Sequence, residues 1–373
     1  MKIITVSNSS ELKKFIKIVW KIYKNDVNWV PPILADRIKL LDKQKNPFFK
    51  HSEMELFYCE NNGEIIGRIG AIINYNHNNT FNDKIGFFGF FESINDQSVS
   101  DLLFQTAEQW LKTKGCTHIR GPVNPSLNDE AGLLIEGFND SPQILMTYNP
   151  EYYILLIENF GFKKVKTLLA YRLMADKFIS PKLERVQNLV RIREKITVRK
   201  IRLKPKKYFI EDVKIIKTIY NSAWEPNWGF VKMTDEEFDF LAEDLKQIVI
   251  DDFVVIAESE GKVVGFALGL PDINQAFKFN KGGSLIGAIY CLLFKKKNIT
   301  RGRILVLGVL PEFQKRGIDS ILYYEVGTAM TKKYPYSEGE ASWILDDNIL
   351  MNRSLEMMNG EVYKKYALYE KEI

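Results

Sequence analysis

The segment Ile304–Leu322 combines residue types that suit the binding of a pyrophosphate. Its apolar first part reads as a buried strand, and Pro311 ends that strand because proline cannot donate to a strand ladder. Apolar residues then recur at helical spacing, so Gln314–Asp319 falls at the start of a helix. A helix start presents unpaired N–H groups and the positive end of the helix dipole to an anion. Gly317 lets the backbone come close to the anion, and Lys315 and Arg316 supply positive charge.

The same segment resembles the acyl-CoA loop of the GNAT superfamily of N-acyltransferases. That loop has Gln or Arg, two variable residues, Gly, one variable residue, and then Gly or Ala. Gln314 and Gly317 match, but the last small position is Asp319, whose carboxylate repels a diphosphate unless it caps the helix. The alternative is an ordinary strand, turn and capped helix. The resemblance implies acetyl-CoA or a longer acyl-CoA as co-substrate, bound by Leu307, Val309, Leu310, Gln314, Lys315, Arg316, Gly317, Ile318, Asp319 and Ser320.

The composition is that of a globular protein large enough for two domains. The chain has 373 residues, 46% hydrophobic and 27% charged, with a net charge of only +5 and no basic run with interleaved aromatics, which disfavours nucleic acid as a partner. Its three separated cysteines suit a reduced cytosolic protein, and its three isolated histidines predict no metal site. No signal peptide or apolar run of about 20 residues is present, so we expect a cytoplasmic protein.

Two landmarks recur at nearly the same shift along the chain. The hairpin sequence Asn61–Gly67 has a counterpart at Ser259–Gly265, an offset of 198 residues. An Asn followed by Gly 12 residues later, which suits the two caps of a helix, occurs at Asn149 and Asn348, an offset of 199 residues. The chain is therefore predicted to be an internal duplication of one domain.

The order of predicted elements in each copy again resembles GNAT proteins, which implies an α/β (α+β) fold of two tandem domains. Each would be a mixed central sheet flanked by helices. We expect a degenerate N-terminal domain at 1–176, a linker at 177–195, and a C-terminal domain with the acyl-CoA site at 196–373. The first copy is called degenerate because its counterpart of the phosphate loop, Ser93–Ser98, has neither glycine nor a basic residue.

N-acyl transfer requires a bound thioester carbonyl, a base for the acceptor ammonium, and a proton for the leaving thiolate. The resemblance places the carbonyl against a backbone N–H near Val309 and Leu310. For the base we select Asp346, which follows the predicted strand Glu338–Leu345, with Asn348 positioning the next helix. Loop carboxylates beside a helix cap are also commonly structural.

The acid is less well defined. Many GNAT enzymes carry a tyrosine four residues before the glycine that ends this helix, a position that is Glu356 here. Tyr363 is our candidate for the substitute, with Tyr366 as the other choice. Packing is the competing explanation for tyrosines in a strand.

The acceptor site is predicted from a dense polar run in the first copy. The segment Gly121–Gly132, with its neighbours, resembles a group of largely uncharacterised bacterial tandem GNAT-like proteins. Its polar residues either bind the acceptor or satisfy the turns of their own loop. The candidates are Asn124, Ser126, Asn128 and Glu130.

An insertion in the second copy is almost wholly apolar. Gly282–Phe294 is followed by Lys295–Lys297, and the first copy has nothing comparable. Such a segment suits a peripheral membrane contact, a long acyl chain, or packing against the other domain. We expect an acyl-CoA-dependent N-acyltransferase acting on a small-molecule or lipid-like amine. The alternatives are long-chain acylation of a sphingoid-type base, as suggested for some similar proteins, and a non-catalytic CoA-binding or scaffold protein. The oligomeric state is left open.

Overall fold

Two β-hairpins with the same turn chemistry occur in the two halves of the chain. The first joins β2 (Ser52–Asn61) to β3 (Glu64–Asn74), and the second joins β11 (Val254–Ser259) to β12 (Lys262–Pro271). Each turn has two central residues with positive φ, the geometry whose twist matches that of the flanking strands. These residues are Asn62 (50°) and Gly63 (82°) in the first turn and Glu260 (49°) and Gly261 (81°) in the second.

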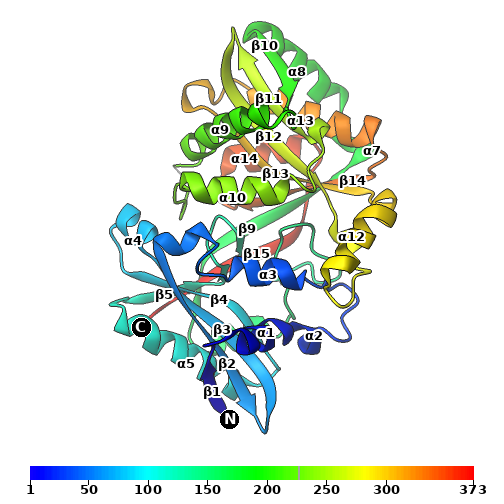
Figure 1. Cartoon of the computed structure of the whole chain (residues 1–373). Coiled ribbons are helices and arrows are strands. Elements are labelled where there is room, and N and C mark those ends of the chain that lie inside the picture. Colours follow the sequence, from blue (N-terminus) through cyan, green and yellow to red (C-terminus); the bar gives the residue numbers. More distant parts are fainter. Residues whose placement is uncertain (226) are drawn as a thin grey trace. The chain divides into compact units, whose positions relative to one another are not determined.

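The structure is a computed structural model that describes residues 1–225 and 227–373 (Figure 1). The chain forms two compact units. Unit 1 comprises Met1–Thr167, Phe277–Phe294 and Lys364–Ile373, and unit 2 comprises Leu168–Ala276 and Lys295–Tyr363.

Unit 1 has a central sheet in the order β1-β2-β3-β4-β5-β15, and only β4 and β5 pair in parallel. Its strands besides β2 and β3 are β1 (Lys2–Thr5), β4 (Ile85–Ser93), β5 (His118–Gly121), β6 (Val123–Asn124), β7 (Glu130–Ala131), β8 (Leu133–Glu136) and part of β15 (Glu361–Glu372). Its helices are α1 (Ser9–Lys17), α2 (Val19–Ile22), α3 (Leu34–Leu40), α4 (Tyr75–Phe81), α5 (Gln97–Thr113), α6 (Tyr153–Asn159) and α12 (Leu285–Phe294).

Unit 2 repeats this order as β10-β11-β12-β13-β14-β9, with β13 and β14 parallel. Its further strands are part of β9 (Lys163–Met174), β10 (Ile196–Lys200), β13 (Arg301–Val309) and β14 (Glu338–Leu345). Its helices are α7 (Ala175–Phe178), α8 (Pro181–Arg193), α9 (Lys206–Ala223), α10 (Asp235–Leu245), α13 (Ile318–Thr328) and α14 (Ile349–Met357), and α11 (Asn274–Phe277) lies at its boundary.

The last strand of each unit comes from the other half of the sequence. Tyr369 on β15, near the end of the chain, pairs with Gly121 on β5 in unit 1. Tyr171 on β9, from the first half, pairs with Ala341 on β14 in unit 2. The units therefore differ from the sequential ranges 1–176 and 196–373. Within the expected linker the structure has helix α8, which packs on α13, where Arg191 bonds Glu325 at 2.6 Å.

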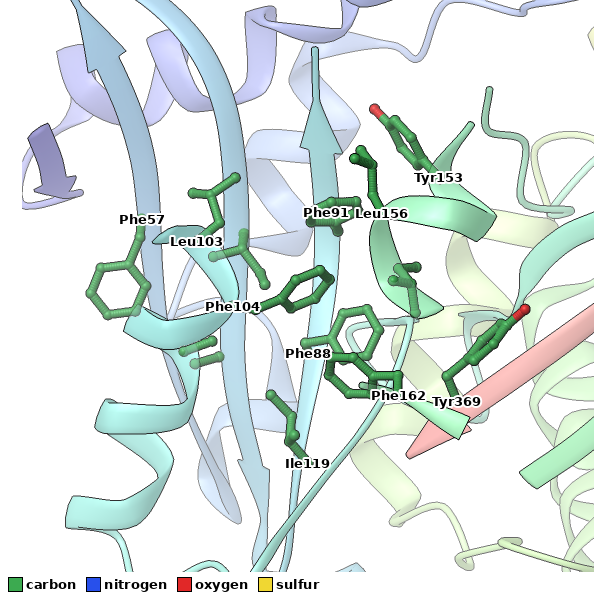
Figure 2. Packing of buried hydrophobic residues seen from close by; sticks show 14 of the residues in the cluster. Phe57, Phe88, Phe91, Leu103, Phe104, Ile119, Tyr153, Leu156, Phe162 and Tyr369 are labelled. Carbon is green, nitrogen blue, oxygen red and sulfur yellow. The ribbon is translucent and has the colours of Figure 1, made fainter. Parts of the chain in front are cut away.

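Each unit has its own apolar core. In unit 1, α5 lies on the sheet and Phe104 stacks on Phe91, with ring centroids 4.7 Å apart (Figure 2). Tyr369 of β15 is fully buried in this cluster, so the end of the chain completes a core that the first half begins. In unit 2, α9 covers the sheet through Phe209, Ile216 and Ile219.

One helix cap differs from the expectation. Asn348 caps α14, since its side chain accepts a bond from the N–H of Met351. Asn149 does not cap α6, because its amide bonds both backbone groups of Leu134 instead, and the helix starts only at Tyr153. No helix among the described residues is long and apolar enough to cross a membrane.

The two parallel strands of unit 1 separate, and the chain itself fills the gap. Pairing of β4 with β5 ends at Phe87 and Arg120, although β4 continues to Ser93. Beyond this point the N–H of Phe90 donates to Oδ1 of Asn124 at 2.6 Å. A Cβ added at Gly89 would lie 1.7 Å from the carbonyl oxygen of Val123, so only glycine permits this approach.

Replacing Gly89 with Ala should therefore destabilise the protein. The new methyl group must displace the backbone at Val123, and we expect a loss of about 1–3 kcal/mol or more in the free energy of unfolding. Urea denaturation measures this loss. Gly282→Ala is the matched control, because a Cβ there meets nothing within 4 Å. Equal stability of the two variants would contradict the tight approach.

Candidate functional site

Two parallel strands of unit 2 also separate, and here no segment of the chain pairs across the opening among the described residues. β13 pairs with β14 from Arg301 opposite Glu338 as far as Ile304 opposite Ala341. Both strands continue beyond that point, β13 to Val309 and β14 to Leu345. The strands thus form a wedge whose narrow end lies at Ile304 and Ala341.

The backbone of β13 faces this wedge at alternate residues. The N–H of Leu310 donates to the carbonyl of Val264 on β12 at 2.9 Å, so it is directed away from the wedge. Because strand hydrogen bonds alternate in direction, the N–H groups of Leu307 and Val309 point to the β14 side. The carbonyl of Val309 is also directed away from β12, since it accepts a hydrogen bond from Nε2 of Gln314 at 3.1 Å and not from a strand. Of the two residues expected to bind a carbonyl, Val309 can donate into the wedge and Leu310 cannot.

The predicted phosphate loop lies at the open end of β13. Gly317 is the N-cap of α13 and has a φ of 83°, a conformation that favours glycine. Lys315 is exposed, and Arg316 is half-exposed, bonded to the carbonyl of Glu312 at 2.8 Å and paired with Glu194 at 3.2 Å. A Cβ at Gly317 would lie 3.0 Å from Val190 of α8, so one side of the loop is covered.

Asp319 already occupies part of the helix start. Its carboxylate takes hydrogen bonds from its own backbone N–H and from that of Ser320, while Ser320 Oγ donates to the carbonyl of Gly317 at 2.6 Å. Burial raises the pKa of the Asp319 carboxyl above its usual value. Asp319 thus caps the helix start, as expected for a carboxylate at this position. Its side chain also lies where an anionic ligand would bind.

A buried polar cluster lies at the narrow end of the wedge. Glu340 on β14 and Arg303 on β13 are opposite each other, with Nε of Arg303 3.7 Å from Oε1 of Glu340. Their side chains are 0% and 2% exposed. Ser342 links them, because it donates to Glu340 and accepts from Nε of Arg303 at 2.9 Å. These two charges are desolvated and hold each other in place.

Tyr363 forms the outer member of this cluster. Its hydroxyl donates to Oε2 of Glu340, and its ring lies under the guanidinium of Arg172, 4.3 Å from Cζ to the centroid. Arg172 belongs to β9, which pairs with β14 so that Arg172 stands opposite Glu340. Tyr363 is half-buried, whereas Glu340 is inaccessible. Tyr363 is therefore the member of the cluster that retains partial exposure to solvent.

Asp346 and Asn348 lie at the other end of β14. Asp346 is exposed directly after the strand, and its carbonyl accepts from Nδ2 of Asn352 at 3.1 Å. Asn348 caps α14 and so has the positioning role expected of it. The structure does not bring Asp346 into the cluster around Glu340, although both residues belong to the same strand and its end.

The four predicted acceptor residues have partners within unit 1. Asn124 binds the N–H of Phe90, and Glu130 forms a 2.6 Å ion pair with Arg37. Ser126 Oγ donates to Asp129 at 2.6 Å and accepts from the N–H of Asn128 at 3.1 Å. Two of the four thus support their own turn, one closes the gap beside β4, and one holds α3.

The first copy lacks the features of the wedge in unit 2. Helix α5, the counterpart of α13, is capped by Asp96, whose side chain accepts from the N–H of Ser98. At the end of β4, the buried Glu92 accepts from the hydroxyls of Tyr23 at 3.0 Å and Tyr153 at 2.8 Å. Carboxylates therefore stand at both positions, and Ser93–Ser98 has no lysine or arginine to offset them as Lys315 and Arg316 do in unit 2, which disfavours an anionic ligand in unit 1.

Sequence reasoning passed over Glu340 and missed Arg303, Ser342 and Arg172. A signal was present, because Glu338, Glu340 and Ser342 alternate with apolar residues in β14 and so share one face of the sheet. Among the described residues, no group of three or more His, Cys, Asp or Glu side chains is placed to hold a metal ion.

The chain is similar over its full length to two bacterial proteins. It is 35% identical to "Protein YghO" of Escherichia coli strain K12, covering 99% of this chain and 95% of that protein. It is 32% identical to "Bacterial ceramide synthase" of Caulobacter vibrioides, covering 100% and 97%. No known family profile matches the sequence.

Solved structures confirm the expected fold of two tandem domains. A tandem GNAT protein from the clavulanic acid biosynthesis pathway superposes with a TM-score of 0.59 at 9% identity, covering 100% of this chain and 98% of that one. A GCN5-related N-acetyltransferase from Sphaerobacter thermophilus gives a TM-score of 0.53 at 13% identity, covering 99% and 95%.

The buried pair at the narrow end of the wedge should be strongly coupled. Arg303→Met leaves Glu340 buried without its cation, and we expect a loss of about 3–5 kcal/mol in the free energy of unfolding. The double variant Arg303→Met/Glu340→Leu removes both charges and should recover much of that loss. A double-mutant cycle by chemical denaturation measures the coupling, and strictly additive losses would refute it.

Proposed function

We propose that this chain, which belongs to the bacterial tandem GNAT family that includes YghO and the bacterial ceramide synthase, transfers an acyl group from acyl-CoA to an amine. The observation that carries this proposal is the wedge between β13 and β14, which opens beside a basic, glycine-capped helix start. The relatives and solved structures support an acyltransferase in general. The donor, the acceptor and the residue roles below are part of the proposal.

The donor would lie along β13. Its pyrophosphate would meet the loop from Gln314 to Ser320, where Lys315 is exposed and Gly317 lets the backbone approach. Its extended arm would follow the unpaired side of β13 toward the narrow end of the wedge. From Val309 back to Ile304 the strand spans about 17 Å at roughly 3.3 Å per residue. The thioester carbonyl would then lie at Leu307, between the phosphate loop and the cluster around Glu340.

The reaction joins the amine nitrogen to the thioester carbon and breaks the carbon–sulfur bond. The N–H of Leu307 faces the wedge and would stabilise the oxyanion that forms on the carbonyl oxygen. The N–H of Val309, about 7 Å away along the strand, would bind the extended arm. The acceptor must lose a proton before it attacks, and the sulfur leaves as the CoA thiolate, which then takes a proton. Binding both reactants in one orientation supplies part of the rate enhancement.

For proton transfer we propose Tyr363 backed by Glu340. Tyr363 is the half-buried end of a hydrogen-bonded chain that leads to a buried carboxylate, which Arg303 and Ser342 hold in place. Asp346 is the competing candidate, because it is an exposed carboxylate at the wide end of the wedge. We favour a base at the narrow end, because the arm of CoA would extend along β13 in that direction.

A lipid-like amine, such as a sphingoid base, is the acceptor class that we favour over a small polar amine. A relative that is similar over the whole chain carries the name ceramide synthase. The exposed apolar face of α12 is a second, independent observation in this direction. Release of CoA thiol from acetyl-CoA and palmitoyl-CoA, each with a panel of short and long-chain amines, tests both donor and acceptor. Binding of CoA without turnover would instead favour a non-catalytic role.

Two charge changes should move CoA affinity in opposite directions. Lys315→Glu reverses an exposed charge at the phosphate loop and should weaken CoA binding about tenfold, because a charge pair near a surface contributes on the order of 1 kcal/mol or more. Asp319→Asn removes the competing carboxylate and should tighten binding several-fold. Isothermal titration calorimetry with free CoA measures both.

Lys207→Glu is the matched control, because it makes the same charge change at the exposed start of α9 in the same unit. Unchanged affinity in both loop variants, with this control also unchanged, would remove the cofactor site from the loop.

Loss of the tyrosine hydroxyl should reduce turnover without affecting cofactor binding. In Tyr363→Phe we expect kcat to fall by about 100-fold or more, the usual range for a lost acid or base, at constant CoA affinity. Asp346→Asn should leave kcat within a few-fold. Tyr208→Phe, which removes the hydroxyl of a tyrosine that is 41% exposed in the same unit, is the control. The reverse outcome for Tyr363 and Asp346 would transfer the proton-transfer role to Asp346.

A further inference from the structure

Helix α12 presents an unpartnered apolar face. On one side of the helix, Ala288 and Cys291 are only 3% and 1% exposed. The opposite side carries six large apolar side chains that are each more than half exposed. Their spacing of one, three, one, three and one residues places them on a single side of the helix. They are Leu285, Ile286, Ile289, Tyr290, Leu293 and Phe294.

The segment that leads into α12 is fixed on unit 1. The indole N–H of Trp20 donates to the carbonyl of Lys281 at 2.7 Å, and the N–H of Leu34 donates to the carbonyl of Gly283 at 2.9 Å. Gly283 has a φ of 61°, and a Cβ there would lie 2.3 Å from the carbonyl oxygen of Pro32. The helix start is braced by Ser284, whose hydroxyl accepts from the N–H of Gly287. The apolar face is therefore held on a rigid base and is not a loose loop.

The charged residues in the sequence around α12 have one sign. From Phe277 to Thr300 the sequence contains five lysines and no aspartate or glutamate, although acids make up 47 of the 373 residues of the chain. Three of the lysines, Lys295–Lys297, follow the last residue of the helix directly in the sequence. Lys281 precedes the helix and is exposed.

We propose that α12 is a docking surface for an anionic membrane. A short apolar face flanked by lysines is the combination that binds the interface of an anionic bilayer, where apolar side chains enter the acyl region and cations meet the headgroups. A protein partner with an apolar groove fits the face but gives no reason for five lysines without an acid. The first half of the sequence has no counterpart of α12, since only the short helix α4 lies between its hairpin and β4. Docking is separate from the acyl-transfer proposal and is tested without turnover.

The test is co-sedimentation of the full-length protein with vesicles at low salt. Vesicles of equal parts phosphatidylglycerol and phosphatidylcholine should bind the protein at least tenfold more strongly than phosphatidylcholine alone, and added salt should weaken binding because it screens the lysines. Ile286→Ser/Leu293→Ser, at the two most exposed positions of the face, should lower the partition coefficient at least tenfold. Lys295→Gln/Lys296→Gln/Lys297→Gln should lower it and reduce its dependence on salt.

Leu189→Ser/Ile192→Ser is the matched control, because these α8 residues are 62% and 78% exposed and lie on another unit. It should bind vesicles like the wild type. The proposal is overturned if the wild type fails to bind anionic vesicles, or if the α12 variant and the control behave alike. It is also overturned if the α12 variant binds vesicles normally but changes the oligomeric state in sedimentation velocity, since the face would then contact a second copy. Circular dichroism confirms that each variant is folded.

Discussion

The separation of two parallel strands is the constraint on which the rest of the structure depends. When strands stop pairing inside a sheet, their backbone N–H and C=O groups lose partners, and buried groups of this kind must be satisfied. Unit 1 meets the requirement internally, with Asn124 bonded to the N–H of Phe90 and Val123 pressed against Gly89. Unit 2 satisfies the carbonyl of Val309 through Gln314 and leaves the N–H groups of its β13 facing the opening. The same architecture thus gives one closed unit and one unit that can receive an extended ligand.

The buried pair Arg303 and Glu340 occurs in unit 2, the unit whose strands remain open. Complete burial of Arg303 and Glu340 costs hydration that an apolar pair would not, and such pairs are commonly no more stabilising than well-packed hydrophobic residues. They lie where the strands begin to separate, with the half-buried Tyr363 beside them, and the proposed proton transfer would account for keeping charges at this place. Functional sites are where proteins commonly retain features that are locally unfavourable.

Local turn chemistry allowed much of the fold to be predicted from the sequence. The hairpin glycines at 63 and 261 and the cap Asn348 act over a few residues, so their patterns alone identify the elements they form. The cap expected at Asn149 was wrong because that amide satisfies the backbone of Leu134, a partner 15 residues away that no local pattern specifies.

The site was harder to predict because its members meet only through strand register. Arg303, Glu340 and Arg172 are opposite one another on three strands that are distant in the sequence. Asp346 attracted attention as a carboxylate at a strand end, whereas Glu340 is distinguished only by the cross-strand neighbours that bury it. The phosphate loop could be read from the sequence, but the coverage of Gly317 by Val190 of α8 could not, because that helix lies in a segment expected to be a connector.

The exchange of final strands has a consequence for how the protein is made. Unit 1 contains the first residues to leave the ribosome, yet its sheet and core need Ala367 and Tyr369, which are among the last. About 200 residues separate the end of its first segment from that strand, which at roughly 5–20 residues per second is about 10–40 s of synthesis. Throughout that interval the edge of β5 that receives β15 has no strand beside it, and such an edge can pair with other chains. The first unit to be synthesised is thus the last to be completed, so a nascent chain has a prolonged need for protection.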